Sequence, residues 1–174
     1  METKTKLGNE NIGMTMVFLK NASQTDGKSF EMEWEVFPHA DGPPIHIHPH
    51  AIETYEILEG EMEFYIDGKW MKAKQGDKLV AEIGQPHTFR NKTDKMARVF
   101  NTHQPAMDFD GFFRGLHIFS ESGLVKKGKL NFKGMLGIST LFTNYPEEII
   151  SVKPPAFVMK VMGSLGKALG INFK

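Results

Sequence analysis

The sequence predicts a mainly β domain, built as a barrel or sandwich and followed by helices toward its C-terminal end. Residues 14–103 divide into short segments in which apolar and polar residues alternate, and glycine or proline turns separate them. A helical bundle would need a 3.6-residue apolar period in this region, and none appears. After Pro105 the apolar residues change to helical spacing, so the two parts of the chain differ in secondary structure.

The turn signals place the expected strands in order. The clearest alternation is in residues 29–37, where apolar residues alternate with glutamates. Gly42-Pro43-Pro44 marks a turn into a strand that carries two histidines, and Asp67-Gly68 is a strong hairpin signal. A further strand is bounded by glycines 76 and 84. The other expected strands are residues 14–19, 53–58, 61–66, 69–73, 86–91 and 96–103.

Three helices are expected in the C-terminal part. Residues 108–122 place four phenylalanines and a leucine at helical spacing, and Gly123 is a suitable end. A short second helix is expected over residues 135–142 and a third over 156–169, before Gly170. Their apolar faces predict packing against the barrel or against a second copy of the chain. A lid over a pocket and a membrane-contacting helix are the alternatives.

Length and composition suit a compact globular protein. A chain of 174 residues can bury a sizeable core, and we divide it into a barrel domain, residues 1–104, and a helical extension, residues 105–174. The 21 basic and 21 acidic residues balance, so no nucleic-acid partner is expected. The sequence contains no cysteine, which excludes disulfides and thiolate ligands. It also has no apolar leader or membrane-length run, so a cytoplasmic location is expected.

The charges are distributed unevenly between the two parts. Residues 124–174 hold eight lysines and only two acidic residues, whereas residues 1–123 hold 13 basic and 19 acidic residues. This split predicts that the basic C-terminal region packs near an acidic barrel, in the same chain or in a partner subunit. Binding to a membrane surface is the less favoured alternative.

Three histidines and a glutamate carry most of the functional information. His46 and His48 stand at positions i and i+2 of an expected strand, so both imidazoles can point to one face. Glu53 follows shortly after them, and His87 lies in a distant strand. Together these four residues would form a metal site with nitrogen and oxygen ligands. The alternative is that some of them are solvated surface histidines.

The spacing of these residues resembles the first signature motif of the cupin superfamily. That motif reads Gly-x5-His-x-His-x3,4-Glu-x6-Gly, and its last four positions are met here by His46, His48, Glu53 and Gly60. The motif's first glycine, Gly42, stands three residues before His46 instead of five. A register on His48 and His50 would restore that distance but leave only two residues before Glu53. We therefore assign the first register.

The second cupin motif reads Gly-x5-Pro-x-Gly-x2-His-x3-Asn. Its spacing is met by Gly76, Gly84, His87 and Asn91, with Glu82 in place of the proline. The resemblance covers about residues 30–103 and implies a double-stranded β-helix, or jelly-roll, barrel with a metal at its mouth. It also implies a homodimer, because small cupins commonly pair through strand exchange or sheet packing.

The resemblance further implies that His46, His48, Glu53 and His87 hold one divalent metal ion. Three imidazoles and a carboxylate suit Fe, Mn, Ni, Cu or Zn, and they leave coordination positions open. Open positions accept dioxygen, water or a substrate oxygen. Quercetinase-like cupins, which this chain resembles, use such a site as dioxygenases.

The neighbours of the expected ligands predict a small, mostly apolar substrate that bears oxygen atoms. Tyr55 shares the inward face of Glu53, and Phe89 shares that of His87. Arg90 is expected to face away, so no cation is available for a phosphate group. Tyr55 is the candidate catalytic residue, as a donor of a proton or hydrogen bond. The alternative for Tyr55 is a core tyrosine whose hydroxyl is satisfied.

Three functions fit this site. The favoured one is a metal-dependent oxidoreductase of the dioxygenase type. The alternatives are a non-catalytic small-molecule-binding or sensor protein, and a metal-dependent isomerase or lyase that acts on a carbonyl compound.

The remaining histidines rank lower as site residues. His50 and His103 are weaker candidates for the pocket, whereas His39 is expected in a loop and His117 on a helix surface. Gly163-Ser164-Leu165-Gly166 lacks the spacing and strand context of a nucleophile elbow.

Overall fold

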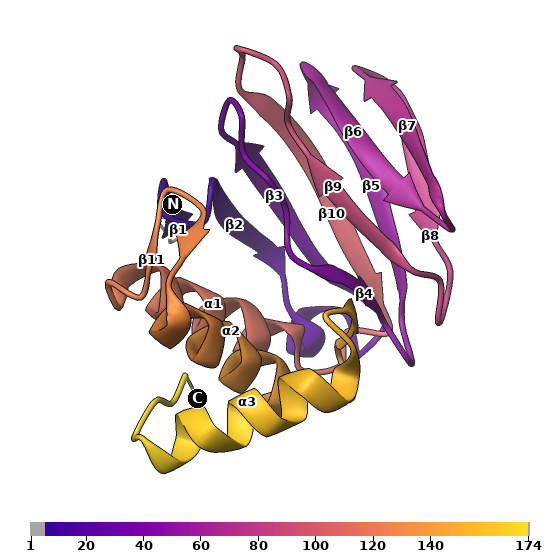
Figure 1. Cartoon of the computed structure of the whole chain (residues 1–174). Helices are drawn as coiled ribbons and strands as arrows, with labels where there is room; N and C mark the ends of the chain where they lie inside the picture. The colour runs from indigo at the N-terminus through magenta and orange to yellow at the C-terminus, as the bar shows by residue number, and fades with distance from the viewer. Residues whose placement is uncertain (1–5, 174) are drawn as a thin grey trace.

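The computed structural model describes residues 6–173 and contains two antiparallel β-sheets that face each other, with three helices at one end (Figure 1). The first sheet is formed by β1 (Lys6–Asn9), β2 (Met14–Lys20), β3 (Phe30–Val36), β5 (Ile52–Glu59), β8 (Lys78–Ala81) and β10 (Ala97–Gln104). The second is formed by β4 (Ile45–Ile47), β6 (Glu61–Ile66), β7 (Lys69–Lys74), β9 (His87–Arg90) and β13 (Ile150–Lys153). Their spatial orders are β1-β2-β3-β10-β5-β8 and β13-β4-β9-β6-β7.

The helical part consists of α1 (Phe109–Glu121), α2 (Phe132–Asn144) and α3 (Ala156–Ala168). A small hairpin of β11 (Val125–Lys126) and β12 (Lys129–Leu130) joins α1 to α2, and a 3-10 helix, η1 (Ala22–Gln24), follows β2. The prediction of a mainly β fold with C-terminal helices is therefore confirmed. The alternation of β3 follows the expected pattern, because Phe30, Met32, Trp34 and Val36 are buried and the glutamates between them are not.

The short strands β1, β11, β12 and β13 were not predicted from the sequence. The most consequential is β13, which comes from the extension but pairs with β4, where Ser151 lies opposite His46. The helix α2 begins three residues earlier than expected, because the side chain of Asn131 accepts a hydrogen bond from the backbone N–H of Gly134 at 2.9 Å and caps it.

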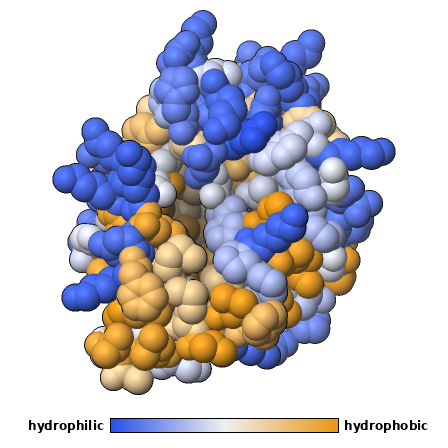
Figure 2. Space-filling model, viewed as in Figure 1, coloured by the Kyte–Doolittle hydropathy of each residue, from blue (hydrophilic) through white to orange (hydrophobic). Residues whose placement is uncertain are grey.

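The helices are stacked below the open end of the barrel, with α3 outermost (Figure 1). The inner face of α3 is narrow and buries Met159, Gly163 and Gly166 against α2. Its outer face exposes Phe157 and Val161, and apolar surface gathers in the corresponding part of Figure 2. The segment that does not fit a nucleophile elbow is thus a packing motif, in which two glycines allow the backbones of α2 and α3 to approach closely.

Substituting Gly166 by valine is expected to destabilise the protein. A Cβ atom at this position would lie 2.3 Å from Oγ1 of Thr140 and 3.1 Å from the carbonyl oxygen of Leu136. Overpacking of this kind costs about 1–3 kcal/mol, measurable as a lower free energy of unfolding in urea. Ser164→Val on the exposed face of α3 is the matched control, because it adds the same β-branched side chain without a clash. Equal losses in the two variants would contradict the packing role of Gly166.

Candidate metal centre

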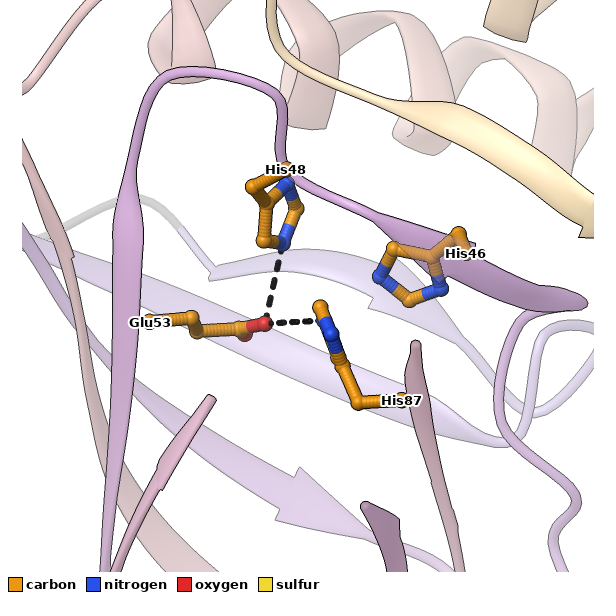
Figure 3. A group of neighbouring side chains, drawn as sticks. All are labelled: His46, His48, Glu53 and His87. Carbon is orange, nitrogen blue, oxygen red and sulfur yellow. Dashed lines mark hydrogen bonds and ion pairs between the residues drawn. The ribbon is translucent and has the colours of Figure 1, made fainter. Parts of the chain in front are cut away.

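Four side chains from the two sheets meet at the open end of the barrel. His46 on β4 lies directly opposite His87 on β9, and His48 follows two residues after His46, just beyond the end of β4. Glu53 on β5 belongs to the other sheet. All four side chains are buried, and each offers a ligand atom within 4.8 Å of the others (Figure 3). The structure thus brings together all four residues that the sequence selected.

Backbone carbonyl groups hold the outer nitrogen of each histidine. Nδ1 of His46 lies 2.8 Å from the carbonyl oxygen of Pro44, and Nδ1 of His87 lies 2.8 Å from that of Gln85. Nδ1 of His48 lies 2.5 Å from the carbonyl oxygen of Glu148. A carbonyl oxygen can only accept, so each neutral ring carries its proton on Nδ1 and keeps a lone pair on Nε2. This tautomer is the one that binds a metal through Nε2.

The lone pairs face a carboxylate. Nε2 of His48 and Nε2 of His87 each lie 2.9 Å from Oε2 of Glu53. The His87 contact is short, yet it lacks hydrogen-bond geometry, so that nitrogen is buried without a hydrogen-bond partner. Two nitrogen lone pairs and a carboxylate oxygen at this separation repel one another unless a proton or cation lies between them. The donor set therefore fits a divalent metal ion, and this buried cluster could bind one.

The ionisation of the cluster agrees with this fit. Burial, together with the neighbouring histidines, holds the pKa of His46 well below its ordinary value. Burial alone would raise the pKa of Glu53, but His103, whose Nε2 faces Oε1, holds that pKa well below its usual range. Glu53 is therefore anionic and His46 neutral near pH 7, which are the forms that coordinate metals.

The carboxylate of Glu53 is fixed by further hydrogen bonds. The hydroxyl of Tyr55 donates to Oε2 at 2.6 Å, and Nδ2 of Asn101 donates to Oε1 at 2.9 Å. Burial, with the charge of Glu53, holds the pKa of Tyr55 well above its ordinary value. The Tyr55 hydroxyl is therefore buried and already donates a hydrogen bond, as the alternative interpretation, a core tyrosine with a satisfied hydroxyl, predicts. Its catalytic role stays a prediction.

Two further groups belong to the centre. His103 on β10 lies opposite Glu53, is buried, and places Nε2 3.4 Å from Oε1 of Glu53. A signal for it existed, because the expected strand 96–103 ends at this residue and points it to the same side as Asn101. The second group is the carbonyl of Glu148, which is 100 positions from the histidine it contacts. Because every residue has a backbone carbonyl group, no residue type in the sequence indicates this contact.

The other candidate residues lie elsewhere. His50 is largely exposed and pairs with Glu147 at 3.0 Å, so the structure places it outside the cluster. His39 is exposed and contacts Asp94 at 2.9 Å. Nδ1 of His117 on α1 accepts the backbone N–H of Gly8 at 3.1 Å. Asn91 of the second motif is buried and donates to the carbonyl oxygen of Lys95, which makes it a structural residue of the turn.

A cavity of about 150 Å³ extends from the cluster toward the helices. His46, His48 and Glu53 contribute to its wall, and α1 and α2 cover it with apolar side chains that include Phe112, Phe113, Leu116, Ile138 and Phe142. Figure 2 shows a hollow on this face of the molecule, with hydrophilic surface above it and apolar surface below. The two helices thus form a roof over the site. Among the described residues, no lysine or arginine lines the cavity, and Arg90 faces outward, over the ring of Trp70.

The metal-free protein is expected to lose stability as the pH falls. Burial lowers the pKa of His103 from 6.5 to about 4, so between these two values the unfolded chain binds a proton that the folded chain does not. The contribution of His103 to the free energy of unfolding is fully present above pH 6.5, and about 3 kcal/mol of it is lost on the way down to pH 4. Urea unfolding at several pH values measures this loss. His103→Gln should show a smaller loss than the wild type, and an unchanged loss would contradict the assignment.

The fold and the donor set define a class, that of β-barrel proteins with a buried site of three histidines and one carboxylate. A family model described as "Cupin_2: Cupin domain" matches residues 32–103. Residues 32–103 therefore form a cupin domain, and the barrel has the cupin fold, with C-terminal helices added. No curated protein sequence matches it significantly. Among residues 6–173, no helix combines the length and apolar character needed to cross a membrane.

Solved structures share this fold. One is a predicted oxalate decarboxylase from Thermotoga maritima, with 21% identity and a TM-score of 0.55 over 59% of this chain and 93% of that chain. Another is an RmlC-like cupin from Shewanella frigidimarina, with 20% identity and a TM-score of 0.52 over 62% and 90%. A third is a cupin-superfamily sugar phosphate isomerase from Silicibacter pomeroyi, with 17% identity and a TM-score of 0.52 over 59% and 72%. At these identities the likeness concerns the fold.

Proposed function

We propose that this protein is a metal-dependent oxidoreductase of the dioxygenase type, which acts on a small, mostly apolar molecule that bears oxygen atoms. One observation carries the proposal: a buried donor set of three imidazoles and one carboxylate opens onto an apolar cavity. A polar ligand set at the end of an apolar pocket suits a substrate with an oxygen at one end and hydrocarbon at the other.

His46, His48, Glu53 and His87 would hold the metal. When bound, Fe, Mn, Ni or Cu would supply open coordination positions and redox chemistry, whereas Zn would act only as a Lewis acid. The chain's own residues prepare the site for it. The three carbonyl groups orient the imidazoles, Tyr55 and Asn101 hold the carboxylate, and the phenylalanines of α1 exclude water from the substrate.

The lining of the cavity disfavours the isomerase alternative for phosphorylated substrates. A phosphate group needs lysine, arginine or a cluster of backbone N–H groups, and the described lining residues include neither lysine nor arginine. A carbonyl isomerase or lyase also needs a base that is separate from the metal ligands, and Asp41 at the rim is the only other carboxylate among those lining residues. The small-molecule-binding alternative uses the same cavity without turnover.

Oxygen uptake tests the proposal. Protein loaded in turn with Fe, Mn, Ni and Cu would be supplied with phenols, catechols, flavonols and diketones in an oxygen-electrode assay, with His48→Ala as the ligand-deficient control. Uptake that depends on both metal and His48 is expected for at least one compound class. Ligand binding without uptake across all four metals would support the binding protein and overturn the dioxygenase.

A further inference from the structure

Two buried nitrogen atoms of the cavity residues are left without partners. Among the described side chains, the buried polar atoms that lack a hydrogen-bond partner are Trp34 Nε1, His87 Nε2, Asn101 Oδ1 and His103 Nδ1. The lone pair on Nε2 of His87 would bind the metal ion of the candidate centre. Trp34 and His103 both line the cavity. Because buried polar groups are nearly always hydrogen-bonded, their unpaired nitrogens indicate contacts with a ligand of the cavity.

His103 presents a hydrogen-bond acceptor. Its Nε2 faces the carboxylate of Glu53 at 3.4 Å, so the proton of the neutral ring belongs on Nε2 and Nδ1 keeps a lone pair. The ring is held in place by Phe109, whose centroid lies 3.8 Å away, and by Phe113 at 5.7 Å. A ligand that pairs with Nδ1 must therefore donate, as a hydroxyl group does.

Trp34 presents the complementary group. The indole N–H can only donate, and the side chain is 2% exposed. Its ring packs between Tyr55, with centroids 5.8 Å apart, and Phe89, with centroids 5.1 Å apart. A ligand atom that pairs with Nε1 must accept, as an ether, carbonyl or hydroxyl oxygen does.

The separation of the two residues limits the ligand. Trp34 lies opposite Val99, four residues before His103 on β10, so the two backbones are about 13 Å apart along the strand. A single ring that reaches both residues therefore carries its two oxygens on opposite sides, as a para-substituted ring does. A cavity of about 150 Å³ also holds one benzene-sized ring. A three-ring flavonol exceeds this volume.

We propose that the cavity binds a single-ring, mostly apolar molecule with oxygen substituents in para positions, of which one is a hydroxyl that donates to Nδ1 of His103 and the other accepts from Nε1 of Trp34. The two residues are specificity determinants. The proposal deepens the proposed function, because it names the class of molecule that would lie beside the metal.

Binding of small phenols to the full-length protein tests this inference. The probes are para-methoxyphenol, para-cresol (which lacks the second oxygen), para-dimethoxybenzene (which lacks the hydroxyl) and ortho-methoxyphenol. Calorimetry measures their affinities for the zinc-loaded and the metal-free protein. Trp34 and Trp70 are the two tryptophans of the chain, so Trp34 fluorescence in a Trp70→Phe background reports occupancy of the cavity itself.

Wild-type protein should bind para-methoxyphenol about tenfold more tightly than each of the other three probes, because each of them lacks or misplaces one hydrogen bond. Trp34→Phe keeps an aromatic ring and should remove only the advantage over para-cresol. His103→Gln keeps a donor toward Glu53 and should remove only the advantage over para-dimethoxybenzene. Circular dichroism would verify that both variants are folded.

Equal affinities of the wild-type protein for all four probes would overturn the inference, as would unchanged fluorescence of Trp34 at saturation. The wild-type series decides the matter even where a variant does not fold. Probe selectivity that persists in metal-free protein would support the inference even if oxygen uptake were absent. Oxygen uptake without probe selectivity would support the proposed function and overturn this inference.

Discussion

His48→Ala should remove most of the metal from protein purified in its metal-bound form. The substitution deletes one nitrogen donor of the four-residue set and leaves the carbonyl oxygen of Glu148 without its hydrogen-bond donor. Loss of a group that merely orients a ligand typically weakens metal binding about 10–100-fold, so loss of the ligand itself should exceed about 100-fold. Elemental analysis of metal per folded protein, after dialysis against a weak chelator, measures the effect.

His50→Ala is the matched control for this prediction. His50 is two residues away, carries the same chemical group, and would be a ligand if the motif were read in the alternative register. In the structure it is exposed and lies 3.0 Å from the exposed carboxylate of Glu147, so metal content should be nearly unchanged. The assignment of the ligands would be wrong if His50→Ala lost the metal and His48→Ala retained it.

Phe109→Ala should be among the most destabilising single substitutions in the helical part. Phe109 begins α1, is fully buried, and its ring contacts His103 at 3.8 Å and His48 at 5.2 Å between centroids. Truncation of a buried phenylalanine costs about 3–5 kcal/mol. Here the space left behind would also join the cavity. The free energy of unfolding from urea titration is the measurement.

Ile118→Ala provides the comparison within the same helix. Ile118 is 47% exposed, and exposed substitutions away from special features change stability by less than about 0.5 kcal/mol. Both variants remove apolar atoms from α1, so their difference isolates burial against the site. A loss below about 1 kcal/mol for Phe109→Ala would mean that α1 does not close the cavity in solution.

Much of the barrel and its candidate ligands could be predicted from the sequence because both depend on short-range patterns. A strand alternates with period two, so His46 and His48 had to share a face, and Tyr55 had to follow Glu53 inward. The motif spacing connected the first pair to His87 across about forty residues of sequence. Strand alternation and motif spacing can both be seen in the sequence alone, and the structure places the four candidate ligands together.

What could not be predicted is the relation between the barrel and the extension. The helical periods of residues 105–174 were evident, but periodicity does not say which surface an apolar face covers. The short strand β13 has too few residues to show a pattern, and its partner β4 lies about a hundred residues earlier. No pattern in the sequence predicts Glu148 beside a histidine.

The hydrogen bond between His48 and the carbonyl oxygen of Glu148 would couple metal binding to the docking of the helical extension. The carbonyl orients the imidazole, so a bound metal would favour the chain conformation in which residues 145–153 are docked. Coupling of this kind is reciprocal. Metal binding should therefore slow amide hydrogen exchange in β13 and α2, and any event that lifts the helices away should release the metal. The extension would then govern the occupancy of a site to which it contributes no side-chain ligand.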